Sequence, residues 1–162
     1  MPSRSAEEPR RGRVSPSDWI RRRSPNRPLQ QRTDALLVID AANVVGSRPD
    51  GWWRDRAAAA RRLVERASVA IDAGLLSPPV VIVLEGIARS GHPQVSTGAV
   101  RVVHAPASGD AAMLSLIADR QVGTGRTSPV VLVSADRQLG AAARSLGADV
   151  RAPTWLLERL GR

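Results

Sequence analysis

Residues 35–46 read ALLVIDAANVVG, and this stretch decides the fold. Residues 35–39 form an unbroken apolar run of strand length, which ends at Asp40. A strand that is apolar on both faces is typical of a parallel sheet buried between layers of helices. The stretch therefore predicts the first strand of an α/β domain, with a carboxylate at its carboxyl end.

The rest of the chain repeats this pattern. Further strands are predicted at residues 80–84, 100–103, 130–133 and 149–151. One helix is predicted from the apolar stripe Trp53, Ala57, Ala60, Val64, Ala67 and Ile71, and others begin near residues 108–110, at Asp136 and at Pro153. The order predicts a three-layer α/β fold with a mostly parallel five-stranded sheet. Trp53 is expected in the core, and Trp52 either packs against its loop or stacks on a nucleic-acid base.

Composition restricts the chemistry. The chain has 162 residues, of which 43% are hydrophobic, no cysteine and only two histidines. Disulfides, thiolate nucleophiles and cysteine-bound zinc are thereby excluded. No apolar run approaches the roughly 20 residues of a membrane span, and no apolar segment follows the N-terminal arginines as in a signal peptide. We expect a cytoplasmic protein without a membrane partner and leave homo-oligomerisation open.

The charge is strongly positive and comes from arginine alone. The 24 basic residues include no lysine and face 15 acidic ones, giving a net charge of +9. The planar guanidinium group matches phosphate oxygens, which favours nucleic acid as the partner. A GC-rich genome, which encodes arginine in place of lysine, explains the bias equally well.

Residues 1–33 carry most of the surplus. They hold nine arginines against three acids, whereas residues 34–162 hold fifteen against twelve. The segment is rich in proline and poor in apolar side chains, which predicts a disordered basic arm ahead of one domain at residues 34–162. Such an arm is a tether for phosphates, a solvated tail, or an artefact of an upstream start codon.

Four acidic residues follow the four longer predicted strands. They are Asp40, Glu85, Asp110 and Asp136. The carboxyl ends of parallel strands meet at one edge of a sheet, where open α/β sheets bind ligands. Asp110 and Asp136 also begin the apolar stripes of their helices, so we expect both to point across the sheet edge and not into solvent. Clustered carboxylates repel one another unless a cation intervenes, and oxygen ligands suit Mg²⁺ or Mn²⁺.

A purely structural role competes with this interpretation. Asp110 and Asp136 also suit the first turn of a helix, where carboxylates cap free amides. We expect Asp40 to differ, because no helix is predicted directly after it. His104 is either a base or a structural side chain. Ser134 lacks the histidine partner of a serine hydrolase, and the glycine-rich stretch 123–128 precedes a strand, unlike a phosphate-binding loop.

The residues from Ile39 to Gly46 resemble the opening motif of NYN domains, a branch of the PIN-like nucleases. That motif is Asp-Gly-x-Asn, and Ala41 replaces its glycine here. Residues 46–56, 84–86, 107–110 and 134–137 resemble a small actinobacterial subgroup of the family, and the likeness covers roughly residues 35–160. Members of that subgroup often carry the label of a nucleotide pyrophosphohydrolase.

The resemblance implies a PIN-like fold and an acidic Mg²⁺ or Mn²⁺ site that cuts RNA. Asp40, Asp110 and Asp136 would hold the metal, and Asn43 would hold the first loop or a phosphate. The subgroup commonly has a second acid at the position of Ala111. The resemblance implies that the missing carboxylate would weaken the binding of a second metal or lower the activity.

We therefore expect a metal-dependent ribonuclease. Asp40, Asp110 and Asp136 bind the metal, Glu85 orients a ligand or water, and the substrate contacts are Asn43, Arg48, Ser134 and Arg137. The alternatives are a nucleoside triphosphate pyrophosphohydrolase using the same acids, and a non-catalytic RNA-binding domain with a decayed site.

Overall fold

Strand β1 (Leu36–Asp40) is the middle strand of a five-stranded sheet. The other strands are β2 (Val80–Leu84), β3 (Val100–His104), β4 (Val130–Val133) and β5 (Asp149–Arg151). Their order is β3-β2-β1-β4-β5, and every neighbouring pair is parallel. The computed structural model describes residues 35–122 and 129–161. The predicted arm, residues 1–33, and the stretch 123–128 lie outside these residues.

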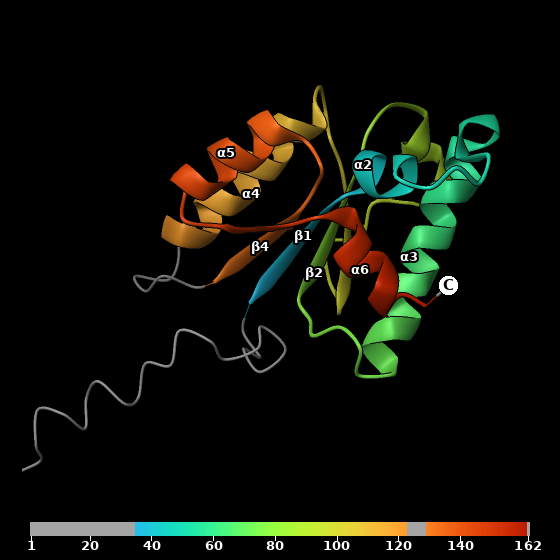
Figure 1. Cartoon of the computed structure of the whole chain (residues 1–162), viewed down its shortest axis with the longest axis horizontal. Coiled ribbons are helices and arrows are strands. Elements are labelled where there is room, and N and C mark those ends of the chain that lie inside the picture. The colour runs from blue at the N-terminus through green and yellow to red at the C-terminus, as the bar shows by residue number, and fades with distance from the viewer. Residues whose placement is uncertain (1–34, 123–128, 162) are drawn as a thin grey trace, which may run out of the picture.

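Helices cover both faces of the sheet. Helices α2 (Ala41–Gly46), α3 (Arg56–Asp72) and α6 (Pro153–Arg159) pack on one face, where Leu37, Ile39 and Ile82 are buried. Helices α4 (Gly109–Val122) and α5 (Arg137–Ser145) pack on the other, against Val38 and Leu132. Figure 1 shows these two groups of helices on opposite sides of the strands. The predicted three-layer α/β fold is confirmed, with an all-parallel sheet among the described strands.

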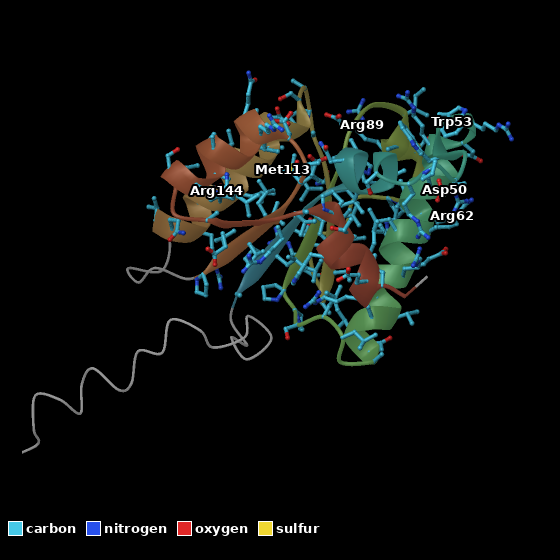
Figure 2. The ribbon with its side chains drawn as sticks, viewed as in Figure 1. Asp50, Trp53, Arg62, Arg89, Met113 and Arg144 are labelled. Carbon is cyan, nitrogen blue, oxygen red and sulfur yellow. The ribbon has the colours of Figure 1, made fainter. Side chains whose placement is uncertain are left out.

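The prediction for Trp53 was wrong. Its ring is 55% exposed, and it belongs to a short 3₁₀ helix, η2 (Trp52–Arg54), instead of α3. Asp55 ends this turn and caps α3 by accepting a hydrogen bond from the amide of Ala58 at 2.8 Å. The spacing of four between Trp53 and Ala57 therefore joins two different elements. Trp53 lies at the outer surface near the start of α3 (Figure 2) and meets the ring of Trp52 edge-on, 6.3 Å between centroids.

The expectation that no helix directly follows Asp40 was also wrong. Helix α2 begins at Ala41, and Asp40 is its N-cap residue. The sequence hid this helix because it has only six residues, too few to display an apolar stripe. Asp40 consequently ends a strand and caps a helix at once.

Among the described residues, no helix is long and apolar enough to span a membrane.

Candidate active site

The four acidic residues lie at the carboxyl edge of the sheet, each reached from a different strand. Asp40 is the last residue of β1, Glu85 directly follows β2, and Asp136 follows β4 after two residues. Asp110 stands in the first turn of α4, the helix that follows β3. Because the strands are parallel, this edge collects all four carboxylates, as open α/β sheets do with their ligand-binding residues.

Asp40 is buried, with 4% of its surface exposed, and its carboxylate is held by three hydrogen bonds. Oδ1 accepts from the backbone amide of Asn43 at 3.1 Å, and Oδ2 accepts from Nδ2 of the same residue at 2.7 Å. Oδ2 also accepts from the hydroxyl of Ser134 at 2.7 Å. Hydrogen bonds to an ionised group are strong and offset the cost of burying it. Asn43 therefore positions the Asp40 carboxylate from within α2.

Ser134 links two of the acids. Its hydroxyl donates to Asp40, and its oxygen accepts from the backbone amide of Asp136 at 3.0 Å. Asp136 in turn caps α5, since its Oδ1 accepts from the amide of Leu139 at 2.8 Å. Ser134 was expected to contact substrate, but it is 4% exposed and its hydroxyl is already used in positioning Asp40 and Asp136.

Glu85 is tied to the beginning of α4. Its Oε2 accepts a hydrogen bond from the backbone amide of Gly109 at 2.8 Å. A Cβ atom on residue 109 would lie only 2.9 Å from that oxygen. Gly109 thus leaves the space in which the carboxylate sits. Sequence reasoning assigned no role to Gly109, although a glycine beside an acid at the start of a predicted helix was a visible signal.

Asp110 differs from the other three acids, because its carboxylate accepts no hydrogen bond from the part of the chain that the structure describes. Ser108 caps the helix in its place, since its hydroxyl oxygen accepts from the amide of Ala111 at 3.2 Å. Asp110 is exposed, contrary to the expectation that it avoids solvent. Its pKa is raised above the usual 3.8, first by desolvation and then by repulsion from Asp136, Asp40 and Glu85. The fields of the other three acids therefore overlap at Asp110.

No family model and no curated protein matches this chain. The fold does match a solved structure, a point mutant of Rae1 (YacP) from Bacillus subtilis. The TM-score is 0.56 at 16% sequence identity, over 77% of this chain and 73% of that chain. The chain has a PIN-like fold. At this identity the likeness shows the fold alone, and the resemblance to the actinobacterial subgroup remains a prediction.

The acids of this PIN-like domain suit a hard divalent cation in their chemistry. All four donors are carboxylates, and Mg²⁺ and Mn²⁺ prefer oxygen ligands. Asp110 adds an exposed carboxylate that the neighbouring acids repel, and a bound cation would relieve this repulsion. Among the described residues, however, no three His, Asp or Glu side chains are already arranged to hold a metal ion. To hold an ion, the exposed carboxylates of Asp110 and Asp136 would have to approach Asp40 more closely.

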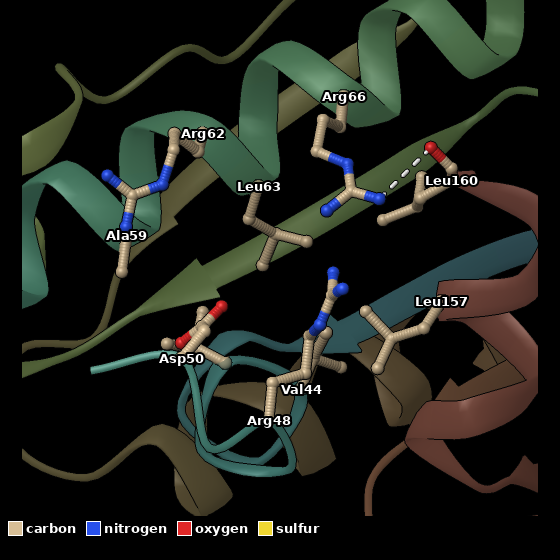
Figure 3. A pocket seen from close by; sticks show the side chains of 10 residues that line it. Val44, Arg48, Asp50, Ala59, Arg62, Leu63, Arg66, Leu157 and Leu160 are labelled. Atoms are coloured by element: carbon tan, nitrogen blue, oxygen red, sulfur yellow. Dashed lines mark hydrogen bonds between the residues drawn. The ribbon is translucent and has the colours of Figure 1, made fainter. Parts of the chain in front are cut away.

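The two expected arginine contacts lie in different places. Arg137 is exposed and directly follows Asp136, at the start of α5. Arg48 lines a small pocket of about 60 Å³ between α2, α3 and α6, together with Asp50, Arg62 and Arg66 (Figure 3). None of the four acids lines this pocket. Arg66 donates from Nη2 to the carbonyls of Leu160 and Gly161, the former at 3.2 Å.

His104 has a structural position at the end of β3. Its Nε2 lies 2.8 Å from the carbonyl oxygen of His92, and its backbone amide lies 3.4 Å from Oε1 of Gln94. Both contacts hold the loop before β3 against this edge strand. The Nε2 atom of His104 is therefore engaged with the backbone, which favours a structural role for His104 over the role of a base.

Proposed function

We propose that this PIN-like domain is a metal-dependent phosphodiesterase that cleaves RNA. The observation that carries the proposal is the position of Asp110. It is exposed, accepts no hydrogen bond from the described residues, and stands in the fields of Asp40, Glu85 and Asp136. A carboxylate in this state holds no other residue in place, and an acid whose pKa is raised by neighbouring acids at a sheet edge is typical of a functional site.

Asp40, Asp110 and Asp136 would hold Mg²⁺ or Mn²⁺. When bound, such an ion lowers the pKa of a coordinated water and stabilises negative charge on a phosphate. The chain's own residues supply the rest. Asn43 and Ser134 fix the Asp40 carboxylate, and the Gly109 amide fixes Glu85 at the neighbouring strand, where it accepts a hydrogen bond from the attacking water.

RNA is the substrate that the charge distribution supports. Arg137 begins at the acidic edge beside Asp136, and Arg48 and Arg62 line the pocket on the other side of α2. These cations would contact phosphates along a strand, and the nine arginines of residues 1–33 would extend the contact. A free nucleotide offers too few phosphates to use cations at both of these places.

The direct test is cleavage of labelled single-stranded RNA with Mn²⁺ by the wild type and Asp40→Asn. Asparagine keeps the shape and the capping ability of residue 40 but removes its charge. Asp55→Asn is the matched control, because Asp55 caps α3 with the same type of bond outside the site. We expect activity in the wild type and the control only. Equal activity in all three proteins would refute the assignment.

Pyrophosphate release and RNA binding, measured beside RNA cleavage, decide between this proposal and its alternatives. A pyrophosphohydrolase would release pyrophosphate from nucleoside triphosphates and leave RNA intact, with the same dependence on Asp40. A non-catalytic RNA-binding domain, which Ala41 and Ala111 would suit, would bind RNA without turnover in any divalent ion.

A further inference from the structure

A cavity of about 350 Å³ opens beside the acidic edge, on the side of α2. Ala41 and Ala42, which directly follow Asp40, form one part of its wall. Glu85 and Ala107 line it from the loops after β2 and β3, and Trp52 and Ile87 complete it. The cavity therefore adjoins the proposed catalytic site through Glu85, and its volume is at the small end of the usual range for ligand pockets, about 300–1,000 Å³.

Trp52 gives this cavity an aromatic wall. The indole is half-buried, and its six-membered ring lies 3.6 Å from the position that a Cβ on Gly46 would take. The guanidinium carbon of Arg56, which also lines the cavity, lies over the Trp52 ring, 5.3 Å from its centre, within the range of a cation-π contact. Trp52 thus supplies a flat aromatic surface, and Arg56 supplies hydrogen-bond donors at that surface.

The remaining wall is mostly apolar but partly open to water. Ile87, in the 3₁₀ helix η3 (Gly86–Gly91), is 68% exposed, and the alanines offer flat methyl surfaces. A planar ring entering here would remove this apolar area from water. Bases meet these requirements, because every base has a face that stacks on an aromatic side chain and an edge that accepts hydrogen bonds.

We propose that this cavity, the base pocket, receives one unstacked base of the RNA strand, with its face on Trp52 and its edge near Arg56. The inference rests on the proposed function, because it takes the phosphate beside this base to be the one at the acids. It assigns Trp52 and Arg56 a binding role that the catalytic site does not require. Stacking makes the pocket tolerant of base identity, so it selects a single-stranded region and not a sequence.

The test compares ligands that differ only in the base. Ribose 5-phosphate and the four ribonucleoside 5′-monophosphates are titrated in EDTA as competitors of a fluorescein-labelled RNA decamer. The proteins are the wild type, Trp52→Ala and Trp53→Ala. Trp53 is the matched control, because it is adjacent and exposed but does not line the cavity. Ala42→Leu is a further variant that fills the cavity from an exposed helical position without removing a packed ring.

The wild type and Trp53→Ala are expected to bind nucleotides about 10-fold more tightly than ribose 5-phosphate, as one stacked base allows. Trp52→Ala and Ala42→Leu are expected to bind nucleotides and ribose 5-phosphate with equal affinity. Both variants should still show the cooperative thermal unfolding of a folded protein. Equal binding of nucleotides and ribose 5-phosphate by the wild type would overturn the base pocket. So would equal losses in Trp52→Ala and Trp53→Ala.

Cleavage of RNA by the wild type with Mn²⁺, measured in parallel, separates the two claims. Cleavage without a contribution of the base to binding overturns the base pocket and leaves the nuclease. Binding of the base without cleavage overturns the nuclease and leaves the pocket.

Discussion

The hydroxyl of Ser134 donates a hydrogen bond of 2.7 Å to Oδ2 of Asp40, between residues 94 positions apart in the sequence. The bond joins the carboxyl ends of β4 and β1, which are neighbours in the sheet. The same oxygen accepts from the amide of Asp136. One buried hydroxyl thus positions two of the three proposed metal ligands, so the order of the site and the stability of the sheet edge depend on the same contact.

Replacing Ser134 by alanine should therefore weaken both the fold and the activity. Asp40 would lose one of its three donors while remaining buried. We expect the free energy of unfolding, measured by urea denaturation, to fall by about 1–3 kcal/mol. RNA cleavage should fall as well. Ser145→Ala is the control, because Ser145 is exposed and bonds only to carbonyls of its own helix. A loss no larger than that of the control would contradict this role.

Asp110→Asn should stabilise the protein when no metal is present. The folded state raises the pKa of this carboxyl above 3.8, so folding binds extra protons between 3.8 and the raised value. Stability contributed by the group therefore decreases as pH rises through that window, and stays reduced above it. The variant lacks this loss, so it should melt at a higher temperature than the wild type at pH 7 in EDTA.

The difference in melting temperature should shrink as pH is lowered through this window, and it should be smallest below 3.8, where the wild-type carboxyl is protonated in both states. Because Asp110 is exposed, salt should reduce the repulsive part of the effect. A variant that melts below the wild type at pH 7 would show that Asp110 stabilises the fold and is not under strain.

Gly109→Ala should separate activity from stability. The new Cβ would lie 2.9 Å from Oε2 of Glu85, an exposed side chain that can rotate away. We expect little change in the urea midpoint but a lower rate of RNA cleavage, because Glu85 leaves its position at the site. Gly140→Ala is the control in α5, where a Cβ would meet side-chain atoms only at 3.5 Å or more. Equal rates for the two variants would exclude a role for Glu85.

Residues 1–33 should contribute to RNA affinity through counterion release. Four or five contacts to phosphates would steepen the plot of log affinity against log salt by about 3 units, at roughly 0.7 for each phosphate on a single strand. Deleting the segment should remove this part of the slope and leave cleavage at saturating RNA unchanged. An unaltered slope would mean that the segment is a solvated tail, and that the +3 of residues 34–162 accounts for binding.

Periodicity was enough to predict the layers of the fold. The strands are unbroken apolar runs, and the apolar stripes that Asp110 and Asp136 begin continue through the buried residues Met113, Ile117, Leu139 and Ala143. The next residue of the second stripe, Leu146, is exposed because it lies beyond the end of α5. It failed where an element is short or a cap interrupts a stripe. Asp55 caps α3, which begins at Arg56, so Trp53 stays outside the helix and the core, and α2 is too short to produce a pattern.

The positions of the four acids followed from the strands, but their surroundings did not. Contacts such as Ser134 to Asp40 and Gly109 to Glu85 join segments that are distant in the sequence, and no local pattern encodes them. The separation of Arg48 from the acids has the same origin. Its place between α2, α3 and α6 depends on the turn at the end of α2, which positions the residue on the far side of that helix.

We expect metal-dependent cleavage of RNA to depend on Asp110, the acid whose carboxylate accepts no hydrogen bond from the described residues. The decisive experiment measures the initial rate of single-stranded RNA cleavage as a function of Mn²⁺ concentration, for the wild type and Asp110→Asn. The wild-type rate should rise with Mn²⁺ and saturate, and the rate of the variant should be at least about 100-fold lower at every concentration, as loss of a charged catalytic group commonly causes. Equal rates in the two proteins, or a wild-type rate that is unchanged in EDTA, would contradict it.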